Sequence, residues 1–211
     1  MRKAFPGMLI LASLLVSAAA YSRLPSRLAT HWGLDGQPDG WSGRAAGAFL
    51  LPATMLLVWG IAQLLPRVDP RRANYAKFRS TYDLVIASVL GVMALLHTAI
   101  IGSALGWPIS VPRVTPVAVA IVFLVVGNAL PRARPNWFFG IRTPWTLSSD
   151  RVWERTHRVG GYLMMMSGGL IALAAVVSPR HAMAVLISTL ALTTVFALAY
   201  SYMLWRREGG S

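Results

Sequence analysis

The sequence contains no cysteine and few acidic residues, with 7 Asp and Glu against 20 Lys and Arg. Without cysteine the chain can form neither a disulfide scaffold nor a thiolate metal site. Charged residues make up only 13% of the 211 residues, about half the usual share in soluble domains. The hydrophobic share of 55% excludes a disordered chain, and so few charges argue against a soluble nucleic-acid-binding protein. We therefore expect a membrane protein with no direct contact to nucleic acid.

Six long stretches of the chain lack Asp, Glu, Lys and Arg altogether. They are Ala4–Ser22, Ala45–Pro66, Leu84–Pro112, Val114–Pro131, Val159–Pro179 and His181–Trp205. At about 1.5 Å per helical residue, each can cross a hydrocarbon core about 30 Å thick. Because backbone groups in lipid must hydrogen-bond within their own segment, the sequence predicts an all-α, polytopic integral membrane protein with six transmembrane helices.

The first stretch also has the pattern of a secretory signal peptide. Arg2 and Lys3 precede its apolar run, and Ala18-Ala19-Ala20 offers a small-residue cleavage site. The pattern leaves cleavage and retention both open, and the remaining topology is the same in either case.

The basic residues are distributed unequally between the two sides of these six spans. Fifteen of the 20 Lys and Arg lie at the two termini, between the second and third spans, or between the fourth and fifth. The positive-inside rule assigns the more basic side to the cytoplasm. The sequence therefore predicts that both termini are cytoplasmic.

His97 is the one ionisable residue deep inside a predicted span. Intramembrane ionisable residues are functional candidates, but without a charged partner we favour a neutral imidazole bonded to a neighbouring hydroxyl. Asp83 begins the third charge-free stretch, where a carboxylate is expected to cap a helix. The alternative hypothesis is a small transporter or channel that uses His97 with Asp83 and Asn128.

The loop between the first two spans is dense in glycine and proline, which predicts tight turns rather than a helix. Its candidate ligand-binding residues are His31, Trp32, Asp35, Asp39 and Trp41. His31, Asp35 and Asp39 are also weak candidate metal ligands, because imidazole and carboxylates suit divalent ions. Turn chemistry explains the two Asp-Gly pairs equally well, so we expect no metal, although a membrane metalloenzyme built on these three residues is a further hypothesis.

The loop between the fourth and fifth spans predicts a short amphipathic helix before the fifth span. Ser149 is a suitable N-cap, and Asp150 follows in the first turn. From there, Val152, Trp153, Thr156 and Val159 share one helical face, and Arg151, Arg155 and Arg158 share another. This pattern is typical of a helix that lies on the cytoplasmic membrane surface and anchors there. Glu154 and His157 lie one turn apart, but a single copy of this pair is a weak metal signal, and we expect no cofactor.

Several motifs of the second half resemble the signature of the SdpI immunity-protein family. They are Gly127-Asn128 with Pro131, Arg134-Pro135-Asn136, the run from Phe139-Gly140-Ile141-Arg142 to Thr143-Pro144-Trp145-Thr146-Leu147, and Trp153 with Thr156-His157-Arg158 and Gly160-Gly161. The first loop, with Leu24-Pro25, His31-Trp32 and Asp39-Gly40-Trp41, is similar to the uncharacterised membrane module that often precedes this family's domain.

The resemblance suggests three parts. Residues 1–66 would be the N-terminal membrane module, residues 67–113 a basic cytoplasmic loop with the third span, and residues 114–211 the SdpI-like module. The residues expected to form the signature or signalling loop are Asn128, Asn136, Phe139, Gly140, Arg142, Thr143, Pro144, Trp145, Trp153, Thr156 and His157.

The resemblance also implies a function. It implies a bacterial inner-membrane protein that is not an enzyme. The best-known members protect against a secreted toxic peptide and, once engaged, hold a cytoplasmic repressor at the membrane. The expected partners are thus the lipid bilayer, a toxic peptide outside and a repressor inside. On this hypothesis Arg142→Ala abolishes signalling or protection without affecting membrane insertion.

Overall fold

The structure, a computed structural model, describes residues 4–209. The long helices are α1 (Ala4–Ala20), α2 (Arg44–Val68), α3 (Tyr75–Ala104), α4 (Val111–Ala129), α6 (Asp150–Val177) and α7 (Pro179–Arg207). The shorter elements are β1 (Arg27–Trp32), β2 (Pro38–Gly43), α5 (Pro144–Ser148) and the 3-10 turns η1 (Tyr21–Arg23), η2 (Arg72–Asn74) and η3 (Leu130–Arg132). Arg2 and Lys3 of the possible signal peptide lie outside the described residues.

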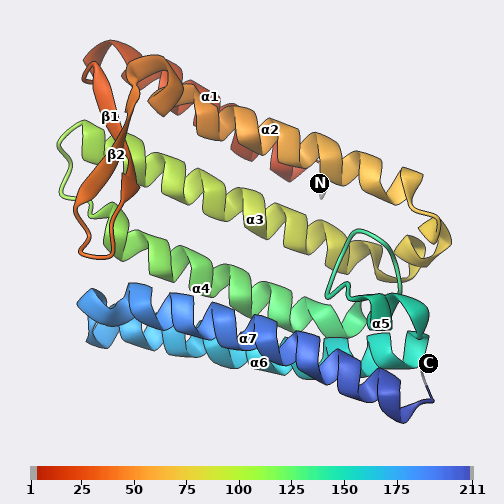
Figure 1. Ribbon diagram of the computed structural model, residues 1–211. Helices are drawn as coiled ribbons and strands as arrows, with labels where there is room; N and C mark the ends of the chain where they lie inside the picture. The colour runs from red at the N-terminus through yellow and green to blue at the C-terminus, as the bar shows by residue number, and fades with distance from the viewer. Residues whose placement is uncertain (1–3, 210–211) are drawn as a thin grey trace.

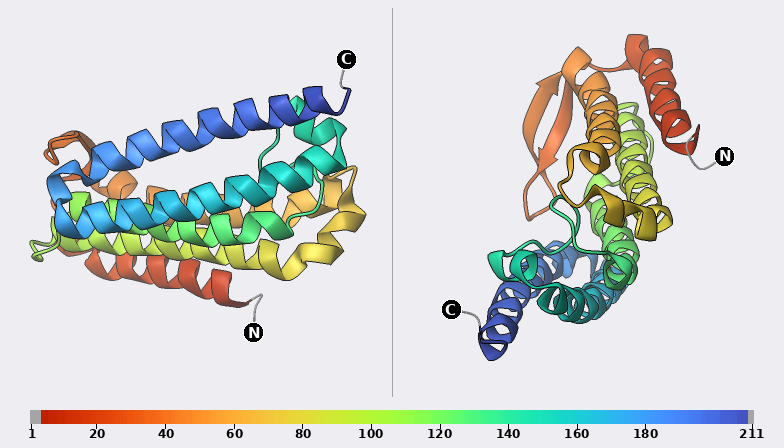
Figure 2. Two further views of the ribbon diagram at one scale, coloured as in Figure 1. Left: turned by 90° about the horizontal axis from the view of Figure 1, so that it is seen from below. Right: turned by 90° about the vertical axis from the view of Figure 1, so that its right-hand side faces the viewer.

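The six long helices lie side by side and cross the molecule in alternating directions (Figure 1). α1 and α2 both pack on α3, α3 packs on α4, α4 on α6, and α6 on α7. Viewed from one end, the helices form a curved row (Figure 2, right). One end carries the α2–α3 connection, α5 and the carboxyl terminus, and the opposite end carries β1 and β2. The two motif-rich loops therefore lie at opposite ends of the molecule.

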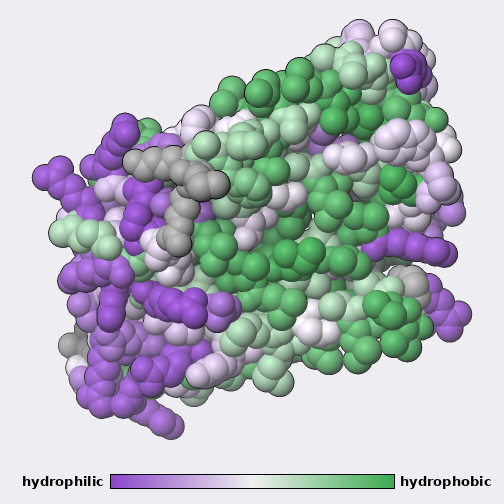
Figure 3. All heavy atoms as spheres, turned by 180° about the vertical axis from the view of Figure 1, so that it is seen from behind, coloured by the Kyte–Doolittle hydropathy of each residue, from purple (hydrophilic) through white to green (hydrophobic). Residues whose placement is uncertain are grey.

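The surface of the helices is that of a membrane protein. All six long helices are long and apolar enough to span a bilayer. Large apolar side chains lie outside, as with Leu57 at 62% and Val176 at 79% exposure. Hydrophobic atoms cover the middle of the molecule, and hydrophilic atoms gather most densely at the end that carries α5 (Figure 3). The chain is a multi-pass membrane protein with six membrane-spanning helices, as its charge-free stretches predict.

The third helix begins and ends earlier than its charge-free stretch. α3 begins at Tyr75, so Asp83 lies inside the helix, and the expectation that it caps the helix is wrong. Its carboxylate instead accepts a hydrogen bond at 2.9 Å from Arg79, one turn earlier. Such a pair lets a helix continue past the hydrocarbon into the interface. α3 ends at Ala104 because Gly106 turns the chain with a φ of +84°.

The loop between α1 and α2 is an antiparallel β-hairpin, which the sequence analysis predicted only as tight turns. Gly36, with a φ of +78°, makes its turn, and the Asp35 carboxylate accepts a hydrogen bond from the Gln37 backbone at 3.0 Å. Leu28 of β1 is 1% exposed and packs among buried residues that include Ala48 of α2 and Ile101 of α3. This contact fixes the hairpin onto the ends of the membrane helices.

Two glycines bring α4 and α6 into backbone contact. A Cβ on Gly127 would lie 2.7 Å from the carbonyl oxygen of Gly161, and a Cβ on Gly161 would lie 2.6 Å from that of Gly127. Small residues at a helix crossing allow this approach in membranes. α6 is therefore held directly on α4, with no side chain between the two backbones.

His97 has the structural role that the sequence analysis favoured. Ser17 donates its hydroxyl proton to the Ala48 carbonyl at 2.6 Å, so His97 Nε2–H donates to Ser17 Oγ at 3.0 Å. This chain of bonds joins α1, α2 and α3. Asp83 pairs with Arg79, and neither contacts His97. The geometry thus gives no support to a polar path from His97 to Asp83.

Candidate functional site

The segment of residues 133–149, here called the signature loop, connects η3 to α6 and contains α5. Asn136 lies at its centre with no exposed surface. Its Oδ1 accepts hydrogen bonds from the backbone N–H groups of Phe138 and Phe139 at 2.9 and 2.6 Å. Its Nδ2 donates to the carbonyl oxygens of Arg134 and Phe139 at 2.8 and 3.0 Å. A buried amide with this many partners fixes the path of the loop around it.

A second buried group, Asp69, holds the signature loop against the α2–α3 connection. Its carboxylate is 2% exposed and accepts hydrogen bonds from Trp137 N at 2.9 Å and from the Tyr75 hydroxyl at 3.1 Å. Tyr75 also lies within hydrogen-bond distance of Asn136 Oδ1, at 3.2 Å. Asn74 adds a bond from Nδ2 to the carbonyl oxygen of Pro135 at 2.8 Å. The two halves of the chain are thus joined by buried polar contacts.

Sequence reasoning missed Asp69 and Tyr75 as site residues. The available signal was charge, because Asp69 is the only acidic residue between Arg67 and Arg79, among five basic ones. A lone carboxylate in a basic loop indicates a specific partner, and here its partners are backbone and hydroxyl donors.

Aromatic rings complete the contact between α3 and the signature loop. The Phe139 ring lies 5.8 Å from that of Phe78 and 5.6 Å from that of Tyr82. Phe78 and Tyr82 are buried, and Ala62 of α2 packs in the same cluster. Edge-on and tilted pairs at these distances are favourable. The first turns of α3 therefore contact the signature loop through both polar and aromatic groups.

Gly140 and His157 fit together where the signature loop crosses α6. The His157 Nε2 accepts a hydrogen bond from Ile141 N at 2.9 Å, and its Nδ1 lies 2.8 Å from the Trp153 carbonyl oxygen. These partners require a neutral imidazole with its proton on Nδ1. Gly140 has a φ of +107°, and a Cβ there would collide with His157 Nε2. Only glycine satisfies both the turn and the close approach.

Residues 143–146 include the N-cap and the first turn of α5. Thr143 is its N-cap and exchanges hydrogen bonds with Thr146 in a capping box, and Pro144 occupies the first turn. The Thr143 hydroxyl also lies 3.1 Å from Ser201 Oγ of α7. The Trp145 ring lies 5.1 Å from that of Tyr202, also on α7. The signature motif thus places α5 against the last membrane helix.

The segment expected as a surface helix is the first part of α6, which continues without a break to Val177. Ser149 caps it as predicted, accepting from Val152 N at 3.2 Å. The role expected of Trp153 as a membrane anchor is wrong. Its ring has no exposed surface, and Nε1–H donates to the Ala133 carbonyl at 3.0 Å. Amphipathicity alone cannot distinguish burial in protein from burial in lipid, which explains the error.

The charged side chains of the site lie on its outside. Arg151, Arg155 and Arg158 are exposed, whereas Thr156 is buried. Arg142 is exposed and donates to the Trp137 carbonyl at 3.2 Å. Glu154 pairs with Arg134 at 3.2 Å, and both ring nitrogens of the buried His157 are bonded to backbone groups, so neither side chain is directed to a shared metal ion. Asn128 is apart from this network, and its side chain accepts from Arg132.

At the opposite end, the hairpin does not bring its three candidate metal ligands together. His31 and Asp39 pair across the strands, while Asp35 is used in the turn. Within residues 4–209 no group of three His, Asp or Glu residues is placed to hold a metal ion. Trp32 and Trp41 instead line a hollow of about 260 Å³ between the hairpin and α3.

The outer hollow and the signature loop are joined by one helix. Ile100, Ser103 and Ala104, at the end of α3, line the hollow. The start of the same helix supplies Tyr75 and the aromatic cluster that hold the signature loop. Two sites at opposite ends of the molecule therefore share one helix, whose first turn is offset from the rest by a kink at Phe78.

Comparisons with known proteins agree with the motifs at both ends of the chain. Residues 132–201 match the SdpI/YfhL protein family, and residues 8–56 match a domain of unknown function, DUF1648. The first match contains the signature loop, α6 and most of α7, whereas the DUF1648 match covers the hairpin.

A relative of known name is similar over nearly the whole length of the chain. The immunity protein SdpI of Bacillus subtilis (strain 168) is 22% identical over 199 residues, which cover 94% of this chain and 93% of the relative. No solved structure matches the chain. The similarity to this relative therefore extends over both of the matched segments.

Proposed function

We propose that this chain is an immunity and receptor-type protein of the bacterial inner membrane. It would protect against a toxic peptide and relay the presence of that peptide to a cytoplasmic regulator. Similarity to an immunity protein over 94% of the chain supports the first part. The observation that carries the second is the position of α3, which lines the outer hollow at one end and contacts the signature loop at the other.

In this proposal the hairpin side faces outward and the basic side faces the cytoplasm. Fifteen of the 20 Lys and Arg fall on the side of the signature loop and the two termini. Basic residues flanking membrane spans favour the cytoplasm. The signature loop is then accessible to a cytoplasmic protein, and the hairpin is accessible to a secreted peptide.

The hollow beside the hairpin suits a hydrophobic peptide. Trp32 and Trp41 line it with Pro38 and Leu28, and Trp41 is 52% exposed. Exposed tryptophans are favoured at binding hot spots because they bury a large apolar area and donate one hydrogen bond. A peptide seated there contacts Ile100 of α3 directly.

The inner surface suits a partner with acidic groups. Arg142, Arg151, Arg155 and Arg158 are exposed on the loop and on α6. Complementary charge speeds association and selects the partner, and the buried network keeps the loop in one shape for recognition. A regulator bound here would respond to movement of α3 through Tyr75 and Asn136.

Toxin challenge of a deletion strain tests the proposal. The native host without this gene is complemented with wild type, with Trp41→Ala or with Arg142→Ala, and growth is measured across a dilution series of the toxic peptide. Wild type restores resistance. Trp41→Ala raises sensitivity about thirtyfold, as loss of a binding hot spot of about 2 kcal/mol would do.

We expect Arg142→Ala to abolish induction of a reporter that the cytoplasmic regulator controls. The amount of the variant protein in the membrane stays unchanged. Leu34→Ala is the control at the outer end, because Leu34 is 71% exposed and does not line the hollow. Equal resistance of the deletion strain and the wild type would contradict the immunity role. Normal reporter induction in the Arg142→Ala strain would contradict the role assigned to Arg142.

A further inference from the structure

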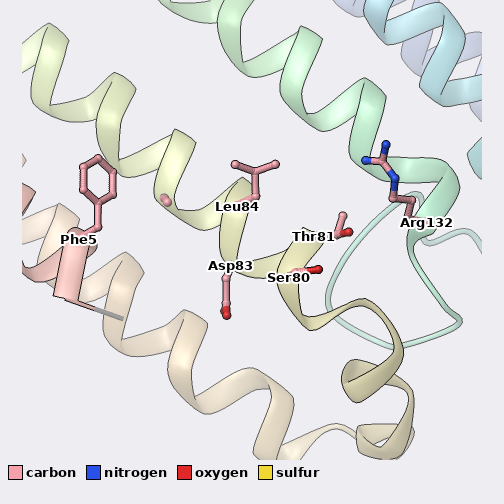
Figure 4. A pocket seen from close by; sticks show the side chains of 7 residues that line it. Phe5, Ser80, Thr81, Asp83, Leu84 and Arg132 are labelled. Carbon is pink, nitrogen blue, oxygen red and sulfur yellow. The ribbon is translucent and has the colours of Figure 1, made fainter. Parts of the chain in front are cut away.

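A further hollow lies away from both sites, between the starts of α1 and α3 and the turn η3 that follows α4. It measures about 480 Å³ and is lined by Phe5, Ser80, Thr81, Asp83, Leu84, Ala87 and Arg132 (Figure 4). Arg132 directly follows one charge-free stretch, and Leu84 begins another. The hollow therefore lies at the boundary between the basic end and the hydrocarbon, where lipid headgroups meet their acyl chains.

Two hydroxyls in this hollow lack the hydrogen bond to the preceding turn that many hydroxyls of the membrane helices make, as does the buried Thr156 on α6. Seven other Ser and Thr side chains donate to the carbonyl four residues earlier, namely Ser13, Thr54, Ser88, Thr98, Thr115, Thr189 and Thr194. Ser80 and Thr81 have no side-chain hydrogen bond to any part of residues 4–209, and they follow Phe78, which interrupts the helix with φ −135° and ψ 23°. Their donors are free for a ligand.

The charge of the hollow favours an anion. Arg132 donates only to the Asn128 carbonyl and side chain, at 3.1 and 3.4 Å, and forms no ion pair within the described residues. Asp83 is the one carboxylate in the lining, and Arg79 neutralises it at 2.9 Å. In Figure 4 Ser80 and Thr81 point toward the side of Arg132, whereas Asp83 points away from it.

The remaining lining is apolar. Leu84 and Ala87 continue along α3 away from the charged end, and Phe5 of α1 closes the opposite side. We propose that this hollow binds one anionic phospholipid. Its phosphate accepts hydrogen bonds from Arg132 and the hydroxyls of Ser80 and Thr81, and one acyl chain lies along Leu84, Ala87 and Phe5. A guanidinium and hydroxyls suit phosphate oxygens, and basic pockets between spans recognise lipid headgroups.

Native mass spectrometry of the purified full chain in detergent tests this proposal without any toxic peptide. Phosphatidylglycerol and phosphatidylcholine with identical acyl chains are titrated separately. Wild type binds one phosphatidylglycerol about tenfold more tightly than phosphatidylcholine, because both carry the phosphate but the choline cation of phosphatidylcholine is repelled by Arg132. Arg132→Gln removes this preference, and Thr81→Val weakens binding of both lipids.

Matched controls distinguish a specific lipid site from the effects of overall charge and of added side-chain volume. Arg155→Gln removes one exposed arginine from the same end and keeps the preference. Ala87→Phe fills the acyl path and lowers binding of both lipids, while Ala191→Phe, on the exposed face of α7, does not. Circular dichroism of each variant checks its helix content.

Three outcomes overturn the proposal. One is equal binding of the two lipids by wild type. Another is an equal loss of the preference for phosphatidylglycerol in Arg155→Gln and Arg132→Gln, which would indicate that only the overall positive charge of this end attracts the lipid. The third is displacement of phosphatidylglycerol by an equal concentration of glycerol phosphate, which would indicate an anion site without a lipid chain.

Discussion

Asp69 is an acidic residue with only 2% of its surface exposed. Three donors compensate for this burial, from the backbone of Arg71, the backbone of Trp137 and the hydroxyl of Tyr75, at 2.7, 2.9 and 3.1 Å. Burying polar groups is unfavourable unless each one is paired. Removing the carboxylate therefore leaves several donors unpaired on two separate loops.

We expect Asp69→Ala to lower the free energy of unfolding by about 1–3 kcal/mol or more, the usual cost of an unpaired buried polar group. Thermal unfolding in detergent measures this. The control is Asp150→Ala, because Asp150 is 73% exposed and its pair with Arg71 contributes less than about 1 kcal/mol. Equal unfolding midpoints for the two variants would contradict the role given to Asp69.

Gly140 is the second residue on which the signature loop depends. Gly140→Ala meets both a φ of +107° and a collision with His157, so we expect a loss of roughly 1–3 kcal/mol and loss of protection. Gly91→Ala is the control, because its Cβ would find nothing within 4 Å. Protection and unfolding midpoints measure both effects, and an unchanged Gly140→Ala would refute the fit to His157.

Single site residues differ in how far the sequence could predict them. The capping role of Ser149 follows from local chemistry and is confirmed. The pairing of Asp69 with Trp137 depends on two segments 68 residues apart in the chain, and no local pattern encodes it. The burial of Trp153 depends on what packs against it, which periodicity does not show.

At the scale of elements, charge-free stretches locate the helices but not their ends. Lipid requires the apolar middle of each span, and this is why all six are predicted. The ends are set by charged pairs at the membrane interface and by turns. In α3 the Arg79–Asp83 pair extends the start of the helix, and the turn at Gly106 ends it. The hairpin depends on the buried contact of Leu28, which a list of turn residues does not indicate.

The contact between α4 and α6 gives a prediction at this scale. Gly161→Leu places a branched side chain where the Gly127 carbonyl lies, so we expect α6 to separate from α4 at a cost of about 1–3 kcal/mol or more. The matched control is Gly169→Leu on the same helix, where a Cβ has open space. Size-exclusion profiles and unfolding midpoints compare the two. Indistinguishable behaviour would show that the backbone contact is unimportant.

At the scale of the whole molecule, the unequal charge of the two ends sets the proposed orientation. Because the sequence has no cysteine, single-cysteine variants can be labelled without background. Leu34→Cys lies in the hairpin loop and Ser148→Cys at the end of α5. We expect a membrane-impermeant maleimide to label Leu34→Cys in intact cells and Ser148→Cys only after permeabilisation. The reverse pattern would invert the topology.

The central claim is that α3 couples the outer hollow to the signature loop. The most direct measurement places an environment-sensitive fluorophore on Ser148→Cys in vesicles with the hairpin outside, and adds the toxic peptide externally. The emission should change in wild type, change less with Tyr75→Phe, and not change with Trp41→Ala. Two results would contradict the coupling. One is an unchanged emission of labelled Ser148→Cys without further substitutions at protective peptide concentrations, and the other is a full emission change when Trp41→Ala is added.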